Sequence, residues 1–308
     1  MEREFVDSLR EALPPHPLLK LGVGDDAAVL AMASSEDCVV TTDLLADGTH
    51  FLASETDAEL IGHKSLAVNL SDLAAMAATP VAVVASLLLP RDGVGSLTWP
   101  EVGRRLLRGM LPLAEEHGTA IAGGDTNVWP GRLAVSITAI GSVPPDDVLT
   151  RAGAQPGDRL LVTGELGGSI EGRHLSFSPR VREARLLNER YPLHAAMDLS
   201  DGLAIDLHRL AEASGVGAVV SARDVPASPA AERLALAAGG DALDYALTDG
   251  EDFELLIAAP PDAAAAIVRE QPVACGVTDI GGVVDHGVWI DRVSGGRVAL
   301  PPNGYEHR

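Results

Sequence analysis

Residues 21–30 read LGVGDDAAVL, a glycine-rich turn that ends in two adjacent aspartates and leads into an apolar run. Gly22 and Gly24 free the backbone to turn tightly. Asp25 and Asp26 repel each other when both are ionised, so such a pair usually has a cation, a helix N-terminus or open water beside it. Taken alone, the stretch fits either a solvated turn, in which Gly and Asp are common, or one wall of a cation site.

Similar acidic groups recur along the chain, where an apolar or β-rich run ends beside Gly, Ser or Thr. They are Thr41-Thr42-Asp43, Ser71-Asp72, Gly124-Asp125-Thr126, Asp198-Leu199-Ser200-Asp201-Gly202 and Gly250-Glu251-Asp252. Each by itself could be a turn or a helix cap. Ser71-Asp72 differs because it falls inside an apolar helical pattern, where a buried carboxylate is costly unless something pairs with it.

The charge balance indicates what could pair with these carboxylates. The chain has 44 acidic and 23 basic residues and a net charge of −21. Part of the acidic excess fits a solubilising surface. Few basic residues stand near the acidic groups in the sequence, however, and hard divalent cations such as Mg²⁺ take carboxylate, hydroxyl and phosphate oxygens as ligands. No His and Cys residues cluster at the spacing of a zinc site.

Two familiar nucleotide-binding signatures are missing from the sequence. It contains no glycine-rich P-loop ending in Lys and Ser or Thr, and no protein-kinase signature set. The residue chemistry therefore indicates a Mg²⁺-dependent phosphoryl-transfer enzyme without a P-loop, in which metal ions neutralise the transferring phosphate.

Composition also limits the partners and the location. An acidic chain does not suit a nucleic-acid backbone or a polybasic membrane anchor. Residues 73–89 are nearly all apolar, but Pro80 splits them, and they fit a helix end followed by a buried strand better than a membrane span. Cys38 and Cys275 are expected to be buried thiols. The N-terminus has no signal-peptide character, so we expect a cytoplasmic protein.

Strands and helices alternate in both halves, which predicts a mixed α/β (α+β) fold in two parts. Pro- and Gly-containing segments at 144–147 and 154–158 predict a linker near residue 150, and hence domains over 1–148 and 149–308. Helices are expected over 2–13, 57–78, 99–116, 181–190, 203–213, 230–238 and 262–270. Strands are expected over 38–43, 81–89, 119–122, 133–143, 159–163, 195–197, 216–220, 253–258 and 273–280.

Seven motifs stand in order along the chain and carry a resemblance. They are GVGDDAA (22–28), TTDLLADGTHF (41–51), KSLAVNLSDLAAMAATP (64–80), GGDT (123–126), LTRAGAQPGD (149–158), DLSDGL (198–203) and GEDFELL (250–256). Together they resemble the thiamine-monophosphate kinase family of the AIR synthase-like ATP-binding superfamily, over nearly the whole chain. The resemblance implies a two-domain fold whose N-terminal halves pair into a homodimer across a β-barrel-like interface.

The resemblance also implies a site and a reaction. The phosphate of thiamine monophosphate would attack the γ-phosphorus of ATP directly, giving thiamine diphosphate and ADP with no covalent nucleophile on the enzyme. Several Mg²⁺ ions would be held by Asp26, Thr41, Thr42, Asp43, Asp72, Asp125, Asp198 and Asp201. ATP would contact Gly124, Asp125, Arg151 and Ser200, and the thiamine end would contact His50, Glu251 and Tyr305.

The chain departs from the family pattern at a few places. Phe253 stands where a tyrosine is frequent, and Pro302 stands where an aromatic residue is frequent, so that a stacking contact would have to come from Tyr305. The segment from Gly167 to Arg180 is short and is expected to be a surface loop. His63 and Lys64 are expected on the exposed side of their helix, although Lys64 could reach a phosphate.

Some assignments depend on single residues, and two other functions are open. Asp206 is expected on a helix surface, and Asp25 is expected to hold its turn through backbone N–H groups or an arginine. Another ATP-dependent enzyme of the same superfamily, such as its purine-branch synthetase, is the first alternative. The second is a non-catalytic acidic protein that binds metal ions, although no EF-hand spacing supports it.

Overall fold

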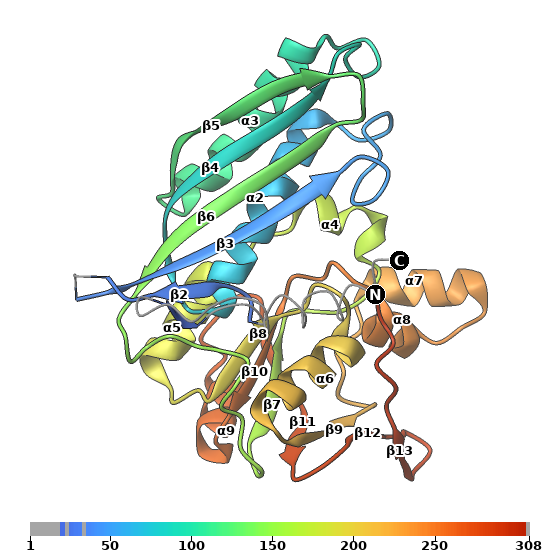
Figure 1. Ribbon diagram of the computed structural model, residues 1–308. Helices are drawn as coiled ribbons and strands as arrows, with labels where there is room; N and C mark the ends of the chain where they lie inside the picture. Colours follow the sequence, from blue (N-terminus) through green and yellow to red (C-terminus); the bar gives the residue numbers. More distant parts are fainter. Residues whose placement is uncertain (1–18, 22–24, 33–34, 306–308) are drawn as a thin grey trace.

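The computed structural model describes residues 19–21, 25–32 and 35–305, and the structural statements below concern these residues. The helix expected over 2–13 lies outside them. Two sheets, one from each half of the sequence, are packed with helices between and around them (Figure 1). Both sheets are mostly antiparallel, and each contains one parallel pair of strands. The mixed α/β (α+β) fold expected from the sequence is therefore confirmed.

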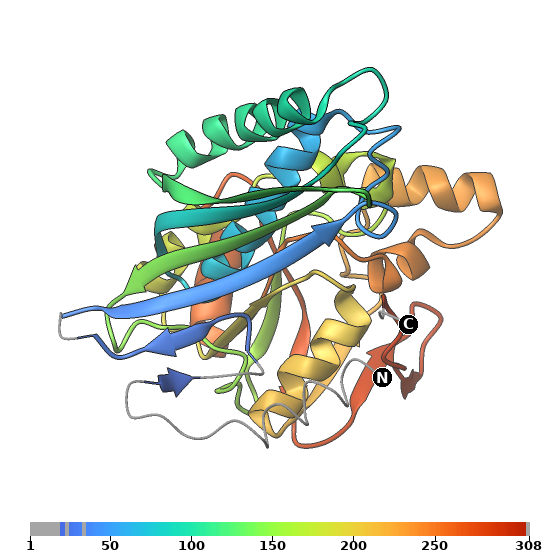
Figure 2. The same cartoon turned by 45° about the horizontal axis from the view of Figure 1, so that its top comes forward.

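The N-terminal sheet has six strands in the order β1-β2-β3-β6-β4-β5. Their bounds are β1 Leu19–Leu21, β2 Ala28–Leu30, β3 Asp37–Ala46, β4 Thr79–Pro90, β5 Ala120–Trp129 and β6 Ala134–Val143. The long strands β3, β6 and β4 lie side by side, and β5 forms the edge. In Figures 1 and 2 the helices of this half lie on one side of the sheet only.

The C-terminal sheet has seven strands in the order β13-β12-β9-β11-β7-β10-β8. Their bounds are β7 Arg159–Thr163, β8 Ala195–Asp198, β9 Gly217–Ser221, β10 Leu255–Ala259, β11 Val277–Val284, β12 Val288–Asp291 and β13 Arg297–Ala299. The helices are α2 Ala58–Ala75, α3 Trp99–Glu116, α4 Arg173–Ser176, α5 Val181–Arg190, α6 Leu203–Ser214, α7 Pro229–Ala238, α8 Ala242–Thr248 and α9 Pro261–Glu270, with a 3₁₀ turn η1 at Ser169–Glu171.

The central C-terminal strands are buried on both faces, which explains their uninterrupted apolar sequences. Along β7, Leu160 and Val162 belong to a core shared with α6, whereas Leu161 belongs to a core shared with α2 and the N-terminal sheet. Successive side chains of a strand point to opposite faces, so a strand between two cores must be apolar at every position. The core that contains Leu161 draws residues from both halves of the chain.

Helix α2 lies between the two halves and is buried on nearly all sides. Fourteen of its 18 residues are buried, which is why its apolar residues follow no single stripe. Asp57 begins the helix, since its side chain accepts a hydrogen bond from the backbone N–H of Glu59 at 2.9 Å. The helix ends at Ala75 and β4 begins at Thr79, so the apolar run is a helix end followed by a strand, as expected. The expected buried strand is wrong in one respect, because Pro80 lies inside β4 and one face of β4 is exposed. None of the described helices is long and apolar enough to cross a membrane.

Two glycines let α2 and α3 cross with their backbones in contact. A Cβ atom on Gly62 would lie 2.0 Å from the carbonyl oxygen of Leu106, and one on Gly109 would lie 1.8 Å from that of Glu59. No flexible side chain can move aside here, because the obstacle is backbone.

We therefore expect Gly109→Ala to lower the free energy of unfolding by about 3 kcal/mol or more, as overpacking in a rigid core does. Gly103→Ala, six residues earlier on α3, is the matched control. Its Cβ would meet only the Leu89 side chain at 3.4 Å, so the better helix propensity of Ala should leave stability equal or higher by up to about 1 kcal/mol. Urea unfolding of both variants measures the difference. Equal loss in both would contradict the close crossing.

Several expected boundaries need correction. The strand expected over 119–122 runs as β5 to Trp129, through Gly123 and Gly124, because the glycines are accommodated in the ladder with β4. The strand expected over 273–280 is β11, which begins at Val277. The sequence patterns did not predict β1, β2, α4, α8, β12 and β13, which are short, because short elements carry little periodic signal. The domain boundary at 148/149 stays a prediction.

Candidate active site

Three carboxylates converge at the end of α2 between the two halves. Asp26 stands before β2, Asp72 lies in the last turns of α2, and Asp198 ends β8. Each offers an oxygen, and these atoms all lie within 4.8 Å of one another. The C-terminal end of a helix carries partial negative charge, and α2 has no basic residue in its last turn to offset it. Negative charge is thus concentrated at a point that a cation would stabilise.

Hydroxyl groups from neighbouring elements orient two of these carboxylates. Thr41 of β3 donates its hydroxyl to Oδ2 of Asp72 at 2.5 Å. Ser71 donates to Oδ2 of Asp198 at 2.6 Å, which links α2 to β8 across the two halves. These bonds answer the question posed by a carboxylate inside an apolar helix, since hydroxyls rather than basic side chains meet it. They leave the negative charge of the cluster in place.

Asp43 adds a fourth carboxylate beside this cluster. Its backbone N–H donates to Oδ1 of Asn69 at 3.2 Å, which fixes β3 against α2. Its Oδ2 is buried with no hydrogen-bond partner among the described residues. A buried carboxylate oxygen without a partner is costly, and a bound cation would satisfy it. The donor set is therefore oxygen only and rich in carboxylate, which fits Mg²⁺.

The pKa values of the cluster follow from its burial. Burial, reinforced by the charges of Asp43, Asp198 and Asp26, raises the pKa of Asp72 well above its usual value. Burial and the charge of Asp26 do the same to the pKa of Asp198. Burial raises the pKa of Asp43 to about 6. Without cations, these carboxylates would hold protons more strongly than ordinary aspartates do.

Arg151 is the cation that the structure does place in the site. Its guanidinium binds Asp26 in a fork, with Nε donating to Oδ2 at 3.0 Å and Nη2 donating to Oδ1 at 2.6 Å. Its backbone N–H donates to Oδ2 of Asp25 at 3.1 Å, and the backbone N–H of Asp26 donates to Oδ1 of Asp25 at 2.9 Å. The structure thus confirms that Asp25 holds its turn through backbone N–H groups.

The turn at 200–202 forms a second acidic pair next to the site. The Arg209 guanidinium donates to Oδ2 of Asp201 at 2.5 Å and to Oδ1 of Asp206 at 2.7 Å. The expectation that Asp206 lies on a helix surface is wrong. Asp206 is fully buried, and its carboxylate accepts hydrogen bonds from the backbone N–H groups of Asp201 and Gly202 at the start of α6. The backbone N–H of Tyr305 donates to the carbonyl of Asp201 at 3.0 Å, which brings the C-terminal segment to this turn.

Two of the expected metal ligands face away from the cluster within this chain. The side chain of Thr42 lies on the opposite face of β3 from Thr41, where its hydroxyl donates to the carbonyl of Ile137 at 3.1 Å. Asp125 is exposed on the edge strand β5. Asp125 pairs with Ser86 of the neighbouring strand β4. Strand β5 is the third strand from β3 in the sheet, and at the usual strand spacing this separates Asp125 from β3 by about 14 Å.

Gly124 lies beside Asp125 at a close approach of two backbones. A Cβ atom at this position would lie 1.8 Å from the carbonyl oxygen of Ala85, so the β4–β5 pairing here admits only glycine. Backbone packing therefore requires glycine at position 124, in addition to the contact with ATP that the family resemblance implies.

The expected thiamine-contacting residues meet at another point along α2. Oε1 of Glu251 accepts a hydrogen bond from Lys64 at 2.5 Å, and Lys64 also donates to the carbonyl of His50 at 2.8 Å. Lys64 is fully buried, so its expected place on an exposed helix face is wrong. The signal was present in the sequence, because a helix that is apolar around its whole circumference leaves few exposed positions.

The segment from Gly167 to Arg180 is also more than a surface loop. It contains η1 and α4 and supplies three basic side chains to the acidic residues of 251–254. Arg180 binds Glu254 in a fork at 2.6 and 2.7 Å, Arg173 pairs with Asp252, and Nδ1 of His174 lies 3.0 Å from Oε2 of Glu251. The carboxylates of Glu251 and Asp252 therefore have basic partners that are distant in sequence.

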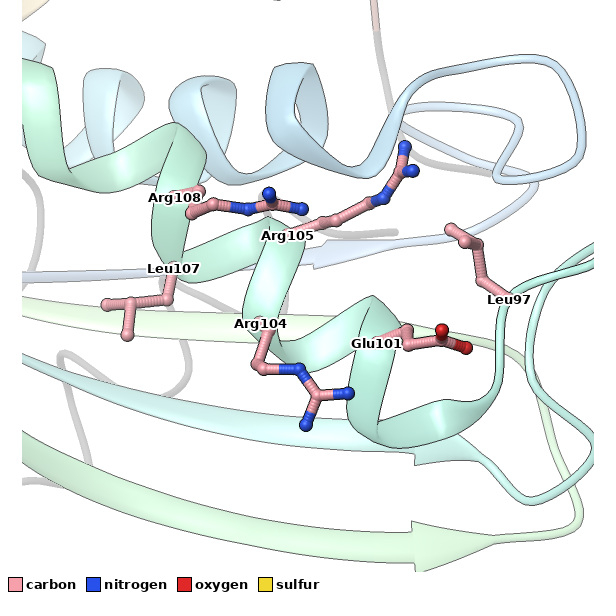
Figure 3. Close-up of a pocket in the computed structure, with 6 residues that line it drawn as sticks. All are labelled: Leu97, Glu101, Arg104, Arg105, Leu107 and Arg108. Atoms are coloured by element: carbon pink, nitrogen blue, oxygen red, sulfur yellow. The ribbon is translucent and has the colours of Figure 1, made fainter.

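A pocket of about 460 Å³ on α3 is separate from the acidic cluster (Figure 3). Its lining residues are Leu97, Glu101, Arg104, Arg105, Leu107 and Arg108. Arg108 pairs with Glu59 at the start of α2, at 3.2 Å, whereas Asp72 lies thirteen residues further along that helix. At the rise of an α-helix this separation is about 20 Å. The pocket therefore does not belong to the candidate active site.

Comparison with known proteins identifies the class first. Residues 24–143 match the family model of the AIR synthase related protein N-terminal domain, and residues 155–290 match that of the C-terminal domain. The two matched regions correspond to the two sheets of the structure. The fold is thus that of an AIR synthase-related protein.

Comparison with individual proteins identifies the family within this class. The thiamine-monophosphate kinase of Rhodopirellula baltica is 38% identical over 100% of this chain and 97% of its own length. The solved structure of thiamine-monophosphate kinase from Stenotrophomonas maltophilia is 36% identical, with a TM-score of 0.73 over 92% of this chain and 95% of that one. The structure of AaThiL complexed with AMPPCP and TMP has a TM-score of 0.84 and 27% identity, over 100% and 97% of the two chains. This chain belongs to the thiamine-monophosphate kinase family.

Proposed function

We propose that this protein transfers the γ-phosphoryl group of ATP to the phosphate of thiamine monophosphate, giving thiamine diphosphate and ADP. The observation that carries the proposal is the convergence of Asp26, Asp72 and Asp198 within 4.8 Å at the junction of the two halves, in a chain of this family. A set of converging carboxylates that can hold cations suits charge neutralisation of phosphates.

In this proposal, Mg²⁺ ions are held by the carboxylates and hydroxyls of the cluster and its surroundings. Asp26, Thr41, Asp43, Asp72 and Asp198 form the part that is assembled within one chain, and Thr42, Asp125 and Asp201 are the further ligands expected from the family pattern. When bound, the ions would supply positive charge that neutralises the transferring phosphoryl group and the leaving ADP.

The chain's own residues position the reactants. Gly124, Asp125, Arg151 and Ser200 are the proposed contacts of ATP. The forked guanidinium of Arg151 can bind two phosphate oxygens once a cation takes its place on Asp26. A phosphate oxygen of thiamine monophosphate forms the new bond to the γ-phosphorus as the bond from the γ-phosphorus to the β-phosphate oxygen breaks. The contribution of these residues to the rate is to position the two reactants.

The thiamine end of the substrate is proposed to contact His50, Glu251 and Tyr305. Thiamine carries a cationic thiazolium ring, for which a carboxylate such as that of Glu251 is an electrostatic match. Burial opposes ionisation of Glu251, but the hydrogen bond from His174 and the charge of Lys64 outweigh it and lower the pKa of Glu251 below its usual value. The carboxylate is therefore ionised at neutral pH and available to a cation.

Purified protein incubated with thiamine monophosphate, ATP and Mg²⁺ tests the reaction. Chromatography should show thiamine diphosphate and ADP in equal amounts, and no product without Mg²⁺. ATP turnover on formylglycinamidine ribonucleotide, with no thiamine diphosphate formed, would instead support the purine-branch alternative. The named relatives do not favour that alternative, nor a non-catalytic metal-binding protein.

We also propose that the protein is a homodimer formed through the N-terminal sheet. The face of this sheet that α2 and α3 leave uncovered exposes large apolar side chains, among them Leu44, Val84 and Leu88, at 60%, 39% and 38% exposure. Several large exposed apolar side chains on one uncovered sheet face favour a protein interface there. Sedimentation should therefore give a dimer, and Leu44→Arg should shift it to a monomer, since burying an unpaired charge opposes association. A wild-type monomer at micromolar concentration would contradict the proposal.

A further inference from the structure

Lys64 occupies the centre of a buried polar cage between the two halves of the chain. It lies in the middle of α2 with no exposed surface, and it is one of only two lysines in the sequence. Its ammonium donates to the carbonyl of His50 at 2.8 Å and to Oε1 of Glu251 at 2.5 Å, and it lies 3.1 Å from Nδ1 of His174. An ammonium group has three N–H donors, and two of them have oxygen acceptors here, the carbonyl of His50 and Oε1 of Glu251. The third faces Nδ1 of His174, which either accepts from Lys64 or donates to Oε2 of Glu251.

The cage is not needed for packing. Burying an ammonium costs several kcal/mol before its partners compensate, and apolar residues of similar volume often replace a buried ion pair without loss of stability. Burial indeed lowers the pKa of Lys64, although the charge and hydrogen bond of Glu251 oppose this. Most neighbours of Lys64 along α2 are apolar or small, from Ile61 to Leu70. A leucine or methionine would therefore suit the apolar surroundings along the helix, and the partners that need the ammonium are the Glu251 carboxylate and the His50 carbonyl. The charge thus points to a role at Glu251 rather than in the packing of α2.

Glu251 is held in one conformation from several directions. Its φ angle is +63°, in the left-handed region, and that of Phe253 is +50°. Such angles persist in non-glycine residues only where the surroundings fix them. The N–H of Glu251 donates to the carbonyl of Ser200 at 2.6 Å, and the ring of Phe253 stacks on Phe177 with 4.2 Å between centroids.

The cage contacts both carboxylate oxygens of Glu251 from the buried side. Lys64 contacts Oε1 and His174 contacts Oε2, while the side chain keeps 30% of its surface exposed. The same ammonium contacts the backbone of His50, which comes from the N-terminal half. Lys64 thus links a turn of one half to a carboxylate of the other, and both belong to the proposed thiamine-binding end of the site.

We propose that Lys64 is a positioning residue for substrate recognition, which holds the Glu251 carboxylate against the His50 turn so that its exposed side receives the cationic ring of the substrate. The inference rests on the proposed function. Lys64 itself is enclosed and does not contact the substrate. Its effect passes through Glu251, and this makes it separable from a merely structural lysine.

A double-mutant cycle on Michaelis constants tests this dependence. Lys64→Met should raise KM for thiamine monophosphate by about tenfold or more, the usual scale for a lost hydrogen bond to a charged group, and leave KM for ATP within about twofold. Glu251→Gln should raise KM for thiamine monophosphate as well. In the double variant the effect should equal that of Glu251→Gln alone, because residues that act through one another are not additive.

The other lysine provides the matched control. Lys20 pairs with Asp37 at 2.6 Å, and its side chain is 44% exposed, so Lys20→Met should leave both Michaelis constants unchanged. Multiplicative effects in the double variant, or an equal rise of both Michaelis constants in Lys64→Met, would reduce Lys64 to a structural residue and overturn the inference.

A spectroscopic measurement avoids the question of folding in the variants. In protein labelled with ¹⁵N-lysine, the side-chain nitrogens should give two signals, and the Lys64 signal is the one absent from Lys64→Met. Thiamine monophosphate without ATP should shift the Lys64 signal and leave that of Lys20 in place. An unmoved Lys64 signal in an enzyme that forms thiamine diphosphate overturns the inference alone, whereas an enzyme that forms no thiamine diphosphate overturns the proposed function.

Discussion

Asp72→Asn will lower the rate of thiamine diphosphate formation by about a hundredfold to a thousandfold, the scale for loss of one charge-stabilising group in a transition state. The same substitution will make the cation-free protein more stable to heat. The two effects have one cause. Asp72 lies next to Asp198 and Asp26 with no basic side chain bonded to it, so its charge serves a bound cation and opposes the fold.

The stability gain follows from the sign of the pKa shift. Burial and like charges raise the pKa of Asp72 in the folded state. The folded protein therefore loses stability as the pH rises above the pKa that Asp72 has in the unfolded chain. Asparagine has nearly the same shape, and its amide oxygen can still accept the Thr41 hydroxyl. It relieves the repulsion without leaving a cavity, so activity and stability should change in opposite directions.

Steady-state rates and thermal melts without Mg²⁺ measure the two effects. Asp279→Asn is the control, because Asp279 of β11 pairs with Arg159 of β7 and takes no part in the cluster. It should keep wild-type activity. An Asp72→Asn protein with wild-type activity, or with a lower melting temperature in the absence of Mg²⁺, would show that Asp72 is an ordinary structural residue.

The sequence could predict the cluster but not all of its geometry. Asp72 was identifiable because a carboxylate in an apolar helix demands a partner, and Asp198 because it ends a β-rich run. Their meeting depends on tertiary packing, since α2 crosses between the two sheets and brings its C-terminal end to β8. Asp125 shows the limit of the same reasoning, because strand order, which local patterns do not fix, places it at the far edge of the sheet from Asp43.

Pairing of charges was the least predictable property. The sequence around Glu251 and Asp252 contains no basic residue, which favoured metal ions as partners. The structure instead supplies Arg173 and His174, almost eighty residues earlier in the chain, and Lys64 from the other half. Sequence proximity is a poor guide to electrostatic partners, because ion pairs depend on spatial contact. Helix and strand positions in the long elements were predictable, because they follow from local periodicity.

Acidification will weaken the binding of Mg²⁺ to the free protein. Protons and cations compete for the same oxygens. Burial raises the pKa of Asp43 to about 6, and burial with neighbouring carboxylates also raises the pKa values of Asp72 and Asp198 well above their usual value. Below about pH 6 at least one proton must leave for each cation that binds, so the dissociation constant should rise about tenfold per pH unit for each proton displaced.

The stability of the protein should depend on pH through the same carboxylates, and Mg²⁺ should change that dependence. These carboxylates have folded-state pKa values above the unfolded value of 3.8, so the cation-free protein loses stability as the pH rises from about 4 through 6 and beyond. Mg²⁺ removes the repulsion only where the carboxylates are ionised. The increase in melting temperature on adding Mg²⁺ should therefore be large at about pH 8 and small at about pH 5.5.

Calorimetric titration with Mg²⁺ in two buffers of different ionisation enthalpy counts the protons released. Asp206 and Asp252, whose pKa values burial raises to about 7, also titrate in this range, but they pair with Arg209 and Arg173 outside the cluster. The contribution of Asp252 is the same with and without Mg²⁺ and cancels in the difference, whereas Asp206 shares Arg209 with the proposed ligand Asp201 and is counted among the linked groups. Asp72→Asn should release fewer protons than the wild type, since one of the competing groups is gone. Mg²⁺ affinity that is equal at both pH values would mean that the cation binds elsewhere than at these carboxylates.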